Sequence, residues 1–326
     1  MTIQEKELTM RFRAIGATFG AAALAMSVAA CAGAKSDVKQ GSAGQELKGA
    51  SLRVGSKDFT EQLVLGQLTL ELLRAHGANV TDKTNIKGST NTRNALTAGQ
   101  LDLYWDYTGT GWVTYLKHVK PIPDSARQYE AIAKEDLEKN KVVWERPAPL
   151  NNTYAFAIRQ AKAQELGVKT MSDVANLAKT KPNEATFCIE SEFSTRDDGW
   201  PGLKKAYGMN VPSGSVKQLD TGVIYTETAK GKTCNFGEVF TTDGRIPAKN
   251  LQVLEDDKHF FPIYNAALTL RKDIADKHPQ IAKLVEPMAQ KLTDETMRKL
   301  NAKVDVDGYE PKKVAHDWLK EQGFVK

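Results

Sequence analysis

Short apolar strands alternate with amphipathic helices from residue 51 onward, and this alternation constrains the fold more than any other feature of the chain. The clearest helix covers residues 60–76, where apolar residues recur at helical spacing between a possible N-cap, Thr60, and a stop, Gly77. Such alternation is typical of an α/β protein. The sequence therefore predicts sheets covered by helices, with ligand sites beyond the carboxyl ends of the strands.

Two β-α-β-α-β units of the same plan follow one another along the chain. The expected strands are 52–55 and 101–104 in the first unit and 186–189, 216–219 and 236–240 in the second. The expected helices are 60–76, 92–98, 202–207 and 223–229, with a mostly helical tail over 273–326 that contains one amphipathic stretch, 281–300. Because each unit places polar and aromatic residues after its last strand, we expect two lobes that face each other across a cleft.

Composition excludes several classes of protein. The chain has 326 residues, of which 41% are hydrophobic, and this predicts two domains with enough apolar material for a sizeable core. After residue 30 no stretch approaches the ~20 apolar residues that a membrane-spanning helix needs. The net charge is only +5 and like charges do not cluster in blocks, so nucleic-acid binding has no support from charge.

The N-terminus has the pattern of a bacterial export signal. Arg11 and Arg13 precede an apolar stretch of small residues that ends in Ala29-Ala30-Cys31. This ending resembles the lipobox of bacterial lipoproteins, in which the cysteine becomes the lipid-modified first residue of the mature chain. We therefore expect a signal peptide over 1–30 and a lipid anchor on Cys31; a short hydrophobic helix with an incidental cysteine is the alternative.

The segment that follows the signal, 31–50, has the composition of a flexible tether. It is rich in Gly, Ala, Ser and Lys and has no periodicity. Glu5 and Glu7 precede the basic pair, so translation from Met10 would give a cleaner signal than translation from Met1. The folded part is thus expected outside the cytoplasm, anchored to the bacterial cell membrane as a lipoprotein.

Cys188 and Cys234 are the two other cysteines of the chain. In an exported protein, two remaining cysteines suggest one disulfide. Two buried free thiols are the alternative. A metal site is not expected, since no histidine or third cysteine stands at ligand spacing.

Motifs of enzyme chemistry are absent from the sequence. Its five histidines form no HExxH pattern, and no GxSxG elbow, P-loop or GxGxxG loop occurs. We expect no catalytic residue, no metal and no cofactor.

Aromatic residues gather where strands and loops are expected to end: Trp105, Tyr107, Tyr154, Phe240 and Tyr264. Converging rings can hold a quaternary ammonium group through their negative faces, with roughly 0.5–2 kcal/mol for each contact. The alternative is that these rings are part of the core. The sequence alone does not decide whether they converge.

Five segments carry a resemblance to a known family: VGSKDFTEQ at 54–62, DYTGT at 106–110, NNTYA at 151–155, TDGRI at 242–246 and LEDDKHFFP at 254–262. Together, and in this order, they resemble the osmoprotectant type of substrate-binding protein from ABC importers for glycine betaine, choline and carnitine. The resemblance extends from residue 52 to the C-terminus.

The resemblance implies a two-lobed periplasmic-binding-protein fold, type II-like, with two crossings between the lobes and hinge closure on the ligand. Lobe 1 would cover 52–151 plus 262–326, and lobe 2 would cover 152–261. Members of this family have no catalytic activity and deliver their solute to an ABC permease in the membrane.

Aromatic binding residues also follow from the resemblance. Tyr107, Tyr154 and Tyr264 match the family's cage aromatics, and Phe240 is a fourth wall. Trp105 begins a Trp-Asp pair where relatives have Pro-Glu, so it is expected to enlarge or reshape the cage.

The polar residues expected at the ligand, by the same resemblance, are Lys57, Thr110, Arg196, Ser89, Thr90 and Asn152. Lys57 and Arg196 would bind a carboxylate, with Arg196 able to bind in a fork. Backbone donors at the helix start near Ser89 would add to this anion site. Asp243 is expected to cap a turn rather than to touch the ligand.

We therefore expect a monomeric binding protein that captures a quaternary-ammonium solute. Glycine betaine leads, followed by choline, carnitine and proline betaine. Asp197 and Asp198 follow Arg196 directly, and these acids would weaken carboxylate binding or favour choline. An exported enzyme or a solute sensor with the same fold is the alternative.

Overall fold

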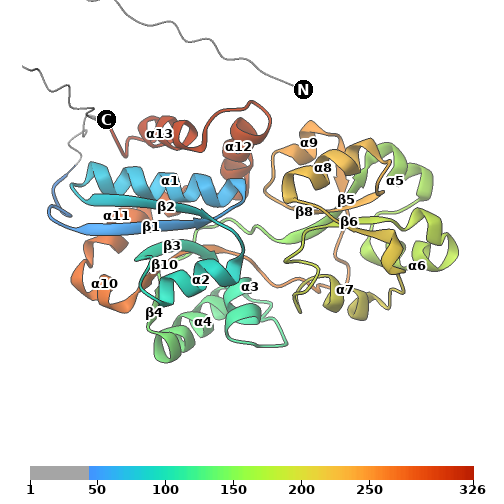
Figure 1. Cartoon of the computed structure of the whole chain (residues 1–326), viewed down its shortest axis with the longest axis horizontal. Helices are drawn as coiled ribbons and strands as arrows, with labels where there is room; N and C mark the ends of the chain where they lie inside the picture. The colour runs from blue at the N-terminus through green and yellow to red at the C-terminus, as the bar shows by residue number, and fades with distance from the viewer. Residues whose placement is uncertain (1–43) are drawn as a thin grey trace, which may run out of the picture. The chain divides into compact units, whose positions relative to one another are not determined.

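The computed structural model describes residues 44–326, which form two lobes, each built on a five-stranded sheet with helices packed against it (Figure 1). The expected α/β class and two-lobed plan are confirmed. The signal peptide, Cys31 and the tether up to residue 43 lie outside the described residues.

Lobe 1 has the strand order β2-β1-β3-β10-β4. Its strands are β1 (Ser51–Lys57), β2 (Asn79–Ile86), β3 (Leu103–Tyr107), β4 (Val142–Trp144) and β10 (Ala266–Arg271). Strand β1 pairs in parallel with β2 and β3, whereas β10 is antiparallel to β3 and β4. Because β1 and β3 are parallel, the residues that follow them lie at the same edge of the sheet.

The helices of lobe 1 cover this sheet. They are α1 (Thr60–Ala75), α2 (Ser89–Thr97), α3 (Thr108–Thr110) with the π-helix Gly111–Tyr115, α4 (Ser125–Asn140), α10 (Lys272–Lys277), α11 (Gln280–Ala289), α12 (Asp294–Asp305) and α13 (Pro311–Glu321). Helix α1 is apolar on most of its surface, since it packs on the sheet and against α13 (Figure 1).

Lobe 2 has the strand order β7-β6-β8-β5-β9. Its strands are β5 (Tyr154–Arg159), β6 (Phe187–Ile189), β7 (Val216–Gln218), β8 (Phe236–Phe240) and β9 (Leu251–Val253). Its helices are α5 (Gln160–Leu166), α6 (Met171–Thr180), α7 (Trp200–Tyr207), α8 (Thr221–Lys230) and α9 (Arg245–Ala248), with short 3-10 turns at Pro182–Glu184 and Ser213–Ser215. A disulfide joins Cys188 in β6 to Cys234 just before β8, so the thiols are not free.

Two crossings connect the lobes and lie side by side. The first leads into β5 and the second into β10. Asn151 pairs with Asn265 in an antiparallel bridge, and the backbone N of Asn152 donates to the carbonyl of Tyr264 at 3.1 Å. The side chain of Asn151 accepts from the backbone N of Tyr264 at 2.7 Å. The two crossings are therefore paired with each other through backbone and side-chain hydrogen bonds.

The tail is mostly helical, as expected. The amphipathic stretch over 281–300 is divided between two helices, because α11 ends at Ala289 and α12 begins at Asp294. Thr293 caps α12: its side chain accepts a hydrogen bond from the backbone N of Thr296. Thr293, a capping residue inside the run of apolar residues at helical spacing, is the signal in the sequence that one helix ends and another begins.

The expected tether, 31–50, extends too far toward β1, because its last residues are already packed on lobe 1. Leu47 is 1% exposed, and its backbone N donates to the carbonyl of His76 at 2.9 Å. The carbonyl of Ala50 accepts from Asn79 at 2.8 Å. The chain is therefore packed on lobe 1 before β1 begins. Within residues 44–326, no helix is long and apolar enough to cross a membrane.

Candidate ligand-binding site

A cavity of about 670 Å³ lies between the two sheets and is lined by residues of both lobes. Its walls come from the ends of β1, β3 and β8, from the start of α2, from the loop after β6 and from the two crossings. The carboxyl ends of strands thus meet at the cavity, as expected for an open α/β sheet.

One side of the cavity is aromatic. Its rings belong to Phe59, Tyr107, Tyr154, Phe240 and Tyr264. Phe59 stacks on Phe240, with ring centroids 5.0 Å apart, and Tyr154 lies 5.2 Å from Phe240 and 5.4 Å from Tyr264. The rings that the sequence singled out therefore converge, with the exception of Trp105.

Tyr154 and Phe240 are brought together by strand pairing. They are direct partners in the antiparallel register of β5 and β8, so their side chains lie on the same face of the sheet. This pairing places one ring at the start of a strand and the other at the end of its neighbour.

Tyr107 is held by a buried carboxylate. Its hydroxyl donates to Glu61 at 2.7 Å, and Glu61 also accepts from Asn152 and Thr242. Asn301 in α12 donates to the same carboxylate at 3.3 Å. Burial raises the pKa of Glu61, although these four hydrogen bonds favour its ionised form. Glu61 thereby connects the Tyr107 ring to the first crossing and to lobe 2.

Tyr264 is packed against the glycine of the DYTGT segment. A Cβ at Gly109 would lie 2.6 Å from Cδ1 of Tyr264 and 3.0 Å from the carbonyl of Ile263. Only glycine therefore lets the second crossing approach α3 this closely. The Tyr264 hydroxyl donates to Asp198 at 2.7 Å.

Lys57 lines the cavity but already has a partner. Its Nζ lies 2.7 Å from Oδ1 of Asp106, and both side chains are almost fully buried. The same ammonium lies 5.2 Å from the ring centroid of Tyr107. The polar residues Thr110, Asn152, Ser89 and Thr90 line the cavity too.

Arg196 is not among the residues that line the cavity. It is 7% exposed and forms a fork with Asp198, with Nε and Nη2 at 2.7 and 2.5 Å from the two carboxylate oxygens. A third nitrogen, Nη1, donates to Glu192 at 2.8 Å. The structure therefore places this arginine behind the cavity wall, with two carboxylates as its partners.

Trp105 does not lie at the cavity, contrary to expectation. It is 1% exposed and its Nε1 donates to Thr69 of α1 at 2.8 Å. Trp105 and Tyr107 share a face of β3 because side chains alternate along a strand. Trp105 lies two residues further back, about 7 Å deeper at ~3.3 Å per residue, and so it belongs to the core of lobe 1.

Asp243 caps a turn, as expected. Its carboxylate accepts from the backbone N of Arg245 at 2.8 Å and also pairs with the Arg245 guanidinium. Arg245 itself lines the cavity.

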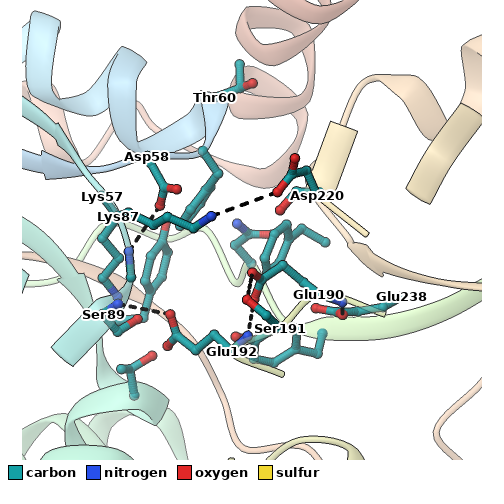
Figure 2. A pocket seen from close by; sticks show the side chains of 18 of the residues that line it. Lys57, Asp58, Thr60, Lys87, Ser89, Glu190, Ser191, Glu192, Asp220 and Glu238 are labelled. Carbon is teal, nitrogen blue, oxygen red and sulfur yellow. Dashed lines mark hydrogen bonds and ion pairs between the residues drawn. The ribbon is translucent and has the colours of Figure 1, made fainter. Parts of the chain in front are cut away.

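Sequence reasoning missed two groups of cavity residues. Phe59 is the fifth ring, although it stands inside the first segment that carried the family resemblance. Three acids, Glu190, Glu192 and Glu238, line the wall from lobe 2 (Figure 2). The polar composition of the loop after β6 was a signal, but the direction of its side chains was not readable from the sequence.

The acids differ in charge state. Burial alone would raise the pKa of Glu192. The positive charges of Arg196 and Lys57, together with the hydrogen bond from the backbone N of Ser89, outweigh burial and lower this pKa to about 2. Burial raises the pKa of Glu238 to about 8, while the backbone N of Glu190 donates to it at 2.6 Å. At neutral pH Glu192 is therefore ionised and Glu238 is protonated.

Metal chemistry has no donor cluster in the part of the chain that the structure describes. No group of three or more His, Cys, Asp or Glu side chains in residues 44–326 is arranged to hold a metal ion.

Comparisons with known proteins agree with this geometry. A family model described as the substrate-binding domain of ABC-type glycine betaine transport systems matches residues 50–321. A glycine-betaine-binding protein of Pseudomonas aeruginosa is 40% identical over 280 residues, which are 84% of this chain and 89% of that protein. An ergothioneine transport permease and binding protein of Helicobacter pylori is 37% identical over 274 residues, 84% of this chain and 48% of that protein.

The fold comparison points the same way. The structure of apo YehZ from Escherichia coli has a TM-score of 0.63 and is 32% identical, and the match covers 84% of this chain and 99% of that one. The match in sequence and fold extends over both lobes. The chain belongs to the family of substrate-binding domains of ABC-type glycine betaine transport systems, which are binding proteins rather than enzymes.

Proposed function

We propose that this protein captures a quaternary-ammonium solute in the cavity between its lobes and delivers it to an ABC permease. The observation that carries the proposal is the convergence of five rings, Phe59, Tyr107, Tyr154, Phe240 and Tyr264, on one side of a single cavity. Ring faces stabilise a trimethylammonium group that no hydrogen-bond acceptor can hold, and each contact contributes roughly 0.5–2 kcal/mol.

The relatives narrow the choice of solute. The Pseudomonas relative is named for glycine betaine, and the Helicobacter relative is named for ergothioneine, another trimethylammonium compound. We propose glycine betaine, choline and carnitine as the first compounds to test. All carry the trimethylammonium head that the ring cluster fits.

The residues proposed at the ligand all line the cavity. They are Lys57, Phe59, Ser89, Thr90, Tyr107, Thr110, Asn152, Tyr154, Phe240 and Tyr264. Arg196 acts from behind the wall through Glu192 and Asp198. Closure of the lobes about the paired crossings would complete the site.

We also propose that the protein is a monomeric lipoprotein outside the cytoplasm, anchored through Cys31 after removal of residues 1–30. Mass spectrometry of the protein from the membrane fraction tests this: the first residue should be a diacylated Cys31. A mature chain that starts elsewhere would contradict the anchor without touching the ligand site.

The function itself is tested by calorimetric titration of the full chain in detergent with glycine betaine, choline, carnitine and proline. Saturable binding of at least one trimethylammonium compound, with proline much weaker, is the expected result. Absence of binding for all three trimethylammonium compounds would overturn the proposal.

A further inference from the structure

The cavity contains a carboxylate of the protein at the place where a ligand carboxylate would be expected. Glu192, in the loop after β6, accepts from the backbone N of Ser89 at the start of α2 at 2.9 Å. Its other oxygen accepts from Nη1 of Arg196 at 2.8 Å. Figure 2 shows Glu192 extending from lobe 2 to Ser89. The backbone N at the start of α2 and the guanidinium of Arg196 are the donors that an anionic ligand group would use.

Arg196 has little capacity left for a second anion. Asp198 takes two of its nitrogens in a fork and Glu192 takes the third, and the Arg196 side chain is only 5% exposed. Two carboxylates around one guanidinium leave this cluster with a net charge of −1. A ligand carboxylate that approached Arg196 would therefore meet negative charge rather than a free cation.

Lys57 is also paired with a carboxylate of the protein. Asp106 lies 2.7 Å from its Nζ, and the side chains are 3% and 0% exposed. Asp106 also accepts hydrogen bonds from the hydroxyls of Tyr104 and Tyr115. Removing a buried carboxylate from such a set of partners is unfavourable, so this pair does not readily open for a ligand anion.

Of the other bases that line the cavity, Arg245 is paired with Asp243. Lys87 lies 3.9 Å from Asp220, and its side chain is 72% exposed, so its charge is largely screened by solvent. Glu190 is a further acid beside Glu192. Its carboxylate accepts a hydrogen bond from the backbone N of Glu192 at 2.5 Å. Of the described side chains that line the cavity, the acids therefore outnumber the bases.

We propose that Glu192 is a specificity-determining residue: its carboxylate fills the anion subsite and makes the cavity select a cationic trimethylammonium solute without a carboxylate over a zwitterionic one. This inference rests on the proposed function and deepens it. The lowered pKa of Glu192 supports it, because the side chain stays ionised throughout the physiological range. The cation is held by the rings, and Glu192 and Glu190 are its counter-charges.

Glu192 also bridges the lobes. It belongs to lobe 2, whereas Ser89 belongs to lobe 1, so its hydrogen bond joins the two sides of the cavity. A ligand carboxylate would otherwise supply this bridge. With the bridge built into the chain, a solute needs only its cationic head to complete the closed form.

Choline and glycine betaine test the proposal because they share the trimethylammonium head and differ in a hydroxyl or a carboxylate. Their dissociation constants are measured by calorimetry for the full chain, for Glu192→Gln and for Asp197→Asn. Asp197 is the matched control, since it is an exposed acid in the same loop that does not line the cavity.

We expect the wild-type protein to bind choline at least tenfold more tightly than glycine betaine. Glu192→Gln should lower this ratio at least tenfold, as choline binding weakens and betaine binding strengthens, whereas Asp197→Asn should change it less than twofold. The wild-type ratio does not depend on whether the variant folds.

A wild-type preference for glycine betaine, or an unchanged ratio in folded Glu192→Gln, would overturn the role of Glu192 and leave the proposed function standing. Failure of the wild-type protein to bind either compound, or any other trimethylammonium solute, would overturn both.

Discussion

Glu238 gives the sharpest prediction about stability, because it is a buried acid at the cavity wall. It is 3% exposed, and burial raises its pKa from 4.5 to about 8. The nearby acids Glu190 and Glu192 add to this rise, whereas the hydrogen bond from the backbone N of Glu190 and the charge of Arg196 oppose it. The folded protein therefore holds a proton that the unfolded chain releases at lower pH.

The sign of the pH dependence follows. Between pH 4.5 and 8 the folded state binds more protons than the unfolded state, so this group's contribution to stability is full below pH 4.5 and is lost as the pH rises. Each tenfold change in proton affinity is worth about 1.4 kcal/mol, so the loss over this window is roughly 5 kcal/mol. Glu238→Gln removes the titration, and the amide oxygen can still accept from the backbone N of Glu190.

The assay is the free energy of unfolding in urea, measured from pH 4.5 to 9 for both proteins. We expect Glu238→Gln to be more stable than the wild-type protein at pH 8 and to lack the wild-type decline. Glu255→Gln, an exposed acid of the same lobe, is the control and should follow the wild-type curve. Parallel curves for Glu238→Gln and the wild-type protein would refute the assignment of a proton to Glu238.

Three further predictions follow from the cage and the disulfide. Tyr154→Ala should weaken the binding of choline and of glycine betaine alike by about 2- to 30-fold, which corresponds to one lost ring contact of roughly 0.5–2 kcal/mol. Tyr154→Phe should bind both ligands as the wild-type protein does. A loss of affinity for only one ligand would contradict a shared ammonium site. Gly109→Ala should displace Tyr264, since its Cβ would lie 2.6 Å from the ring, and should weaken binding severalfold in titrations; unchanged affinity would contradict this packing. Replacing Cys188 and Cys234 together by Ala should lower the free energy of unfolding by up to about 4 kcal/mol for a separation of 46 residues, and equal melting temperatures with and without reductant would argue against the bridge.

The aromatic side of the site was largely predictable from the sequence. Tyr107 and Phe240 end strands, and Tyr154 and Tyr264 stand where the chain crosses between lobes. Position at the end of a parallel strand is set by the order of elements along the chain. Strand and crossing positions therefore marked these four rings as candidates, and the structure shows that they converge at one cavity.

The acidic side of the site was not predictable in the same way. Arg196 stands four residues after Glu192 and two before Asp198, yet only the irregular turn between β6 and α7 decides that both carboxylates contact it. A loop has no periodicity from which side-chain direction can be read. Trp105 was misplaced because the strand was expected to end at residue 104, whereas β3 extends to Tyr107 and holds Trp105 inside the core.

Recognition of the ligand's charge at the ring cluster is tested by comparing choline with 3,3-dimethyl-1-butanol, its uncharged isostere. Both have the same shape, so a difference in calorimetric affinity isolates the attraction between the cation and the rings with their neighbouring acids. We expect saturable choline binding at least 30-fold tighter than binding of the isostere, equivalent to about 2 kcal/mol. Equal affinity for the two compounds, or tighter binding of the uncharged one, would show that the cavity is only an apolar pocket and would contradict charge recognition by the rings and acids.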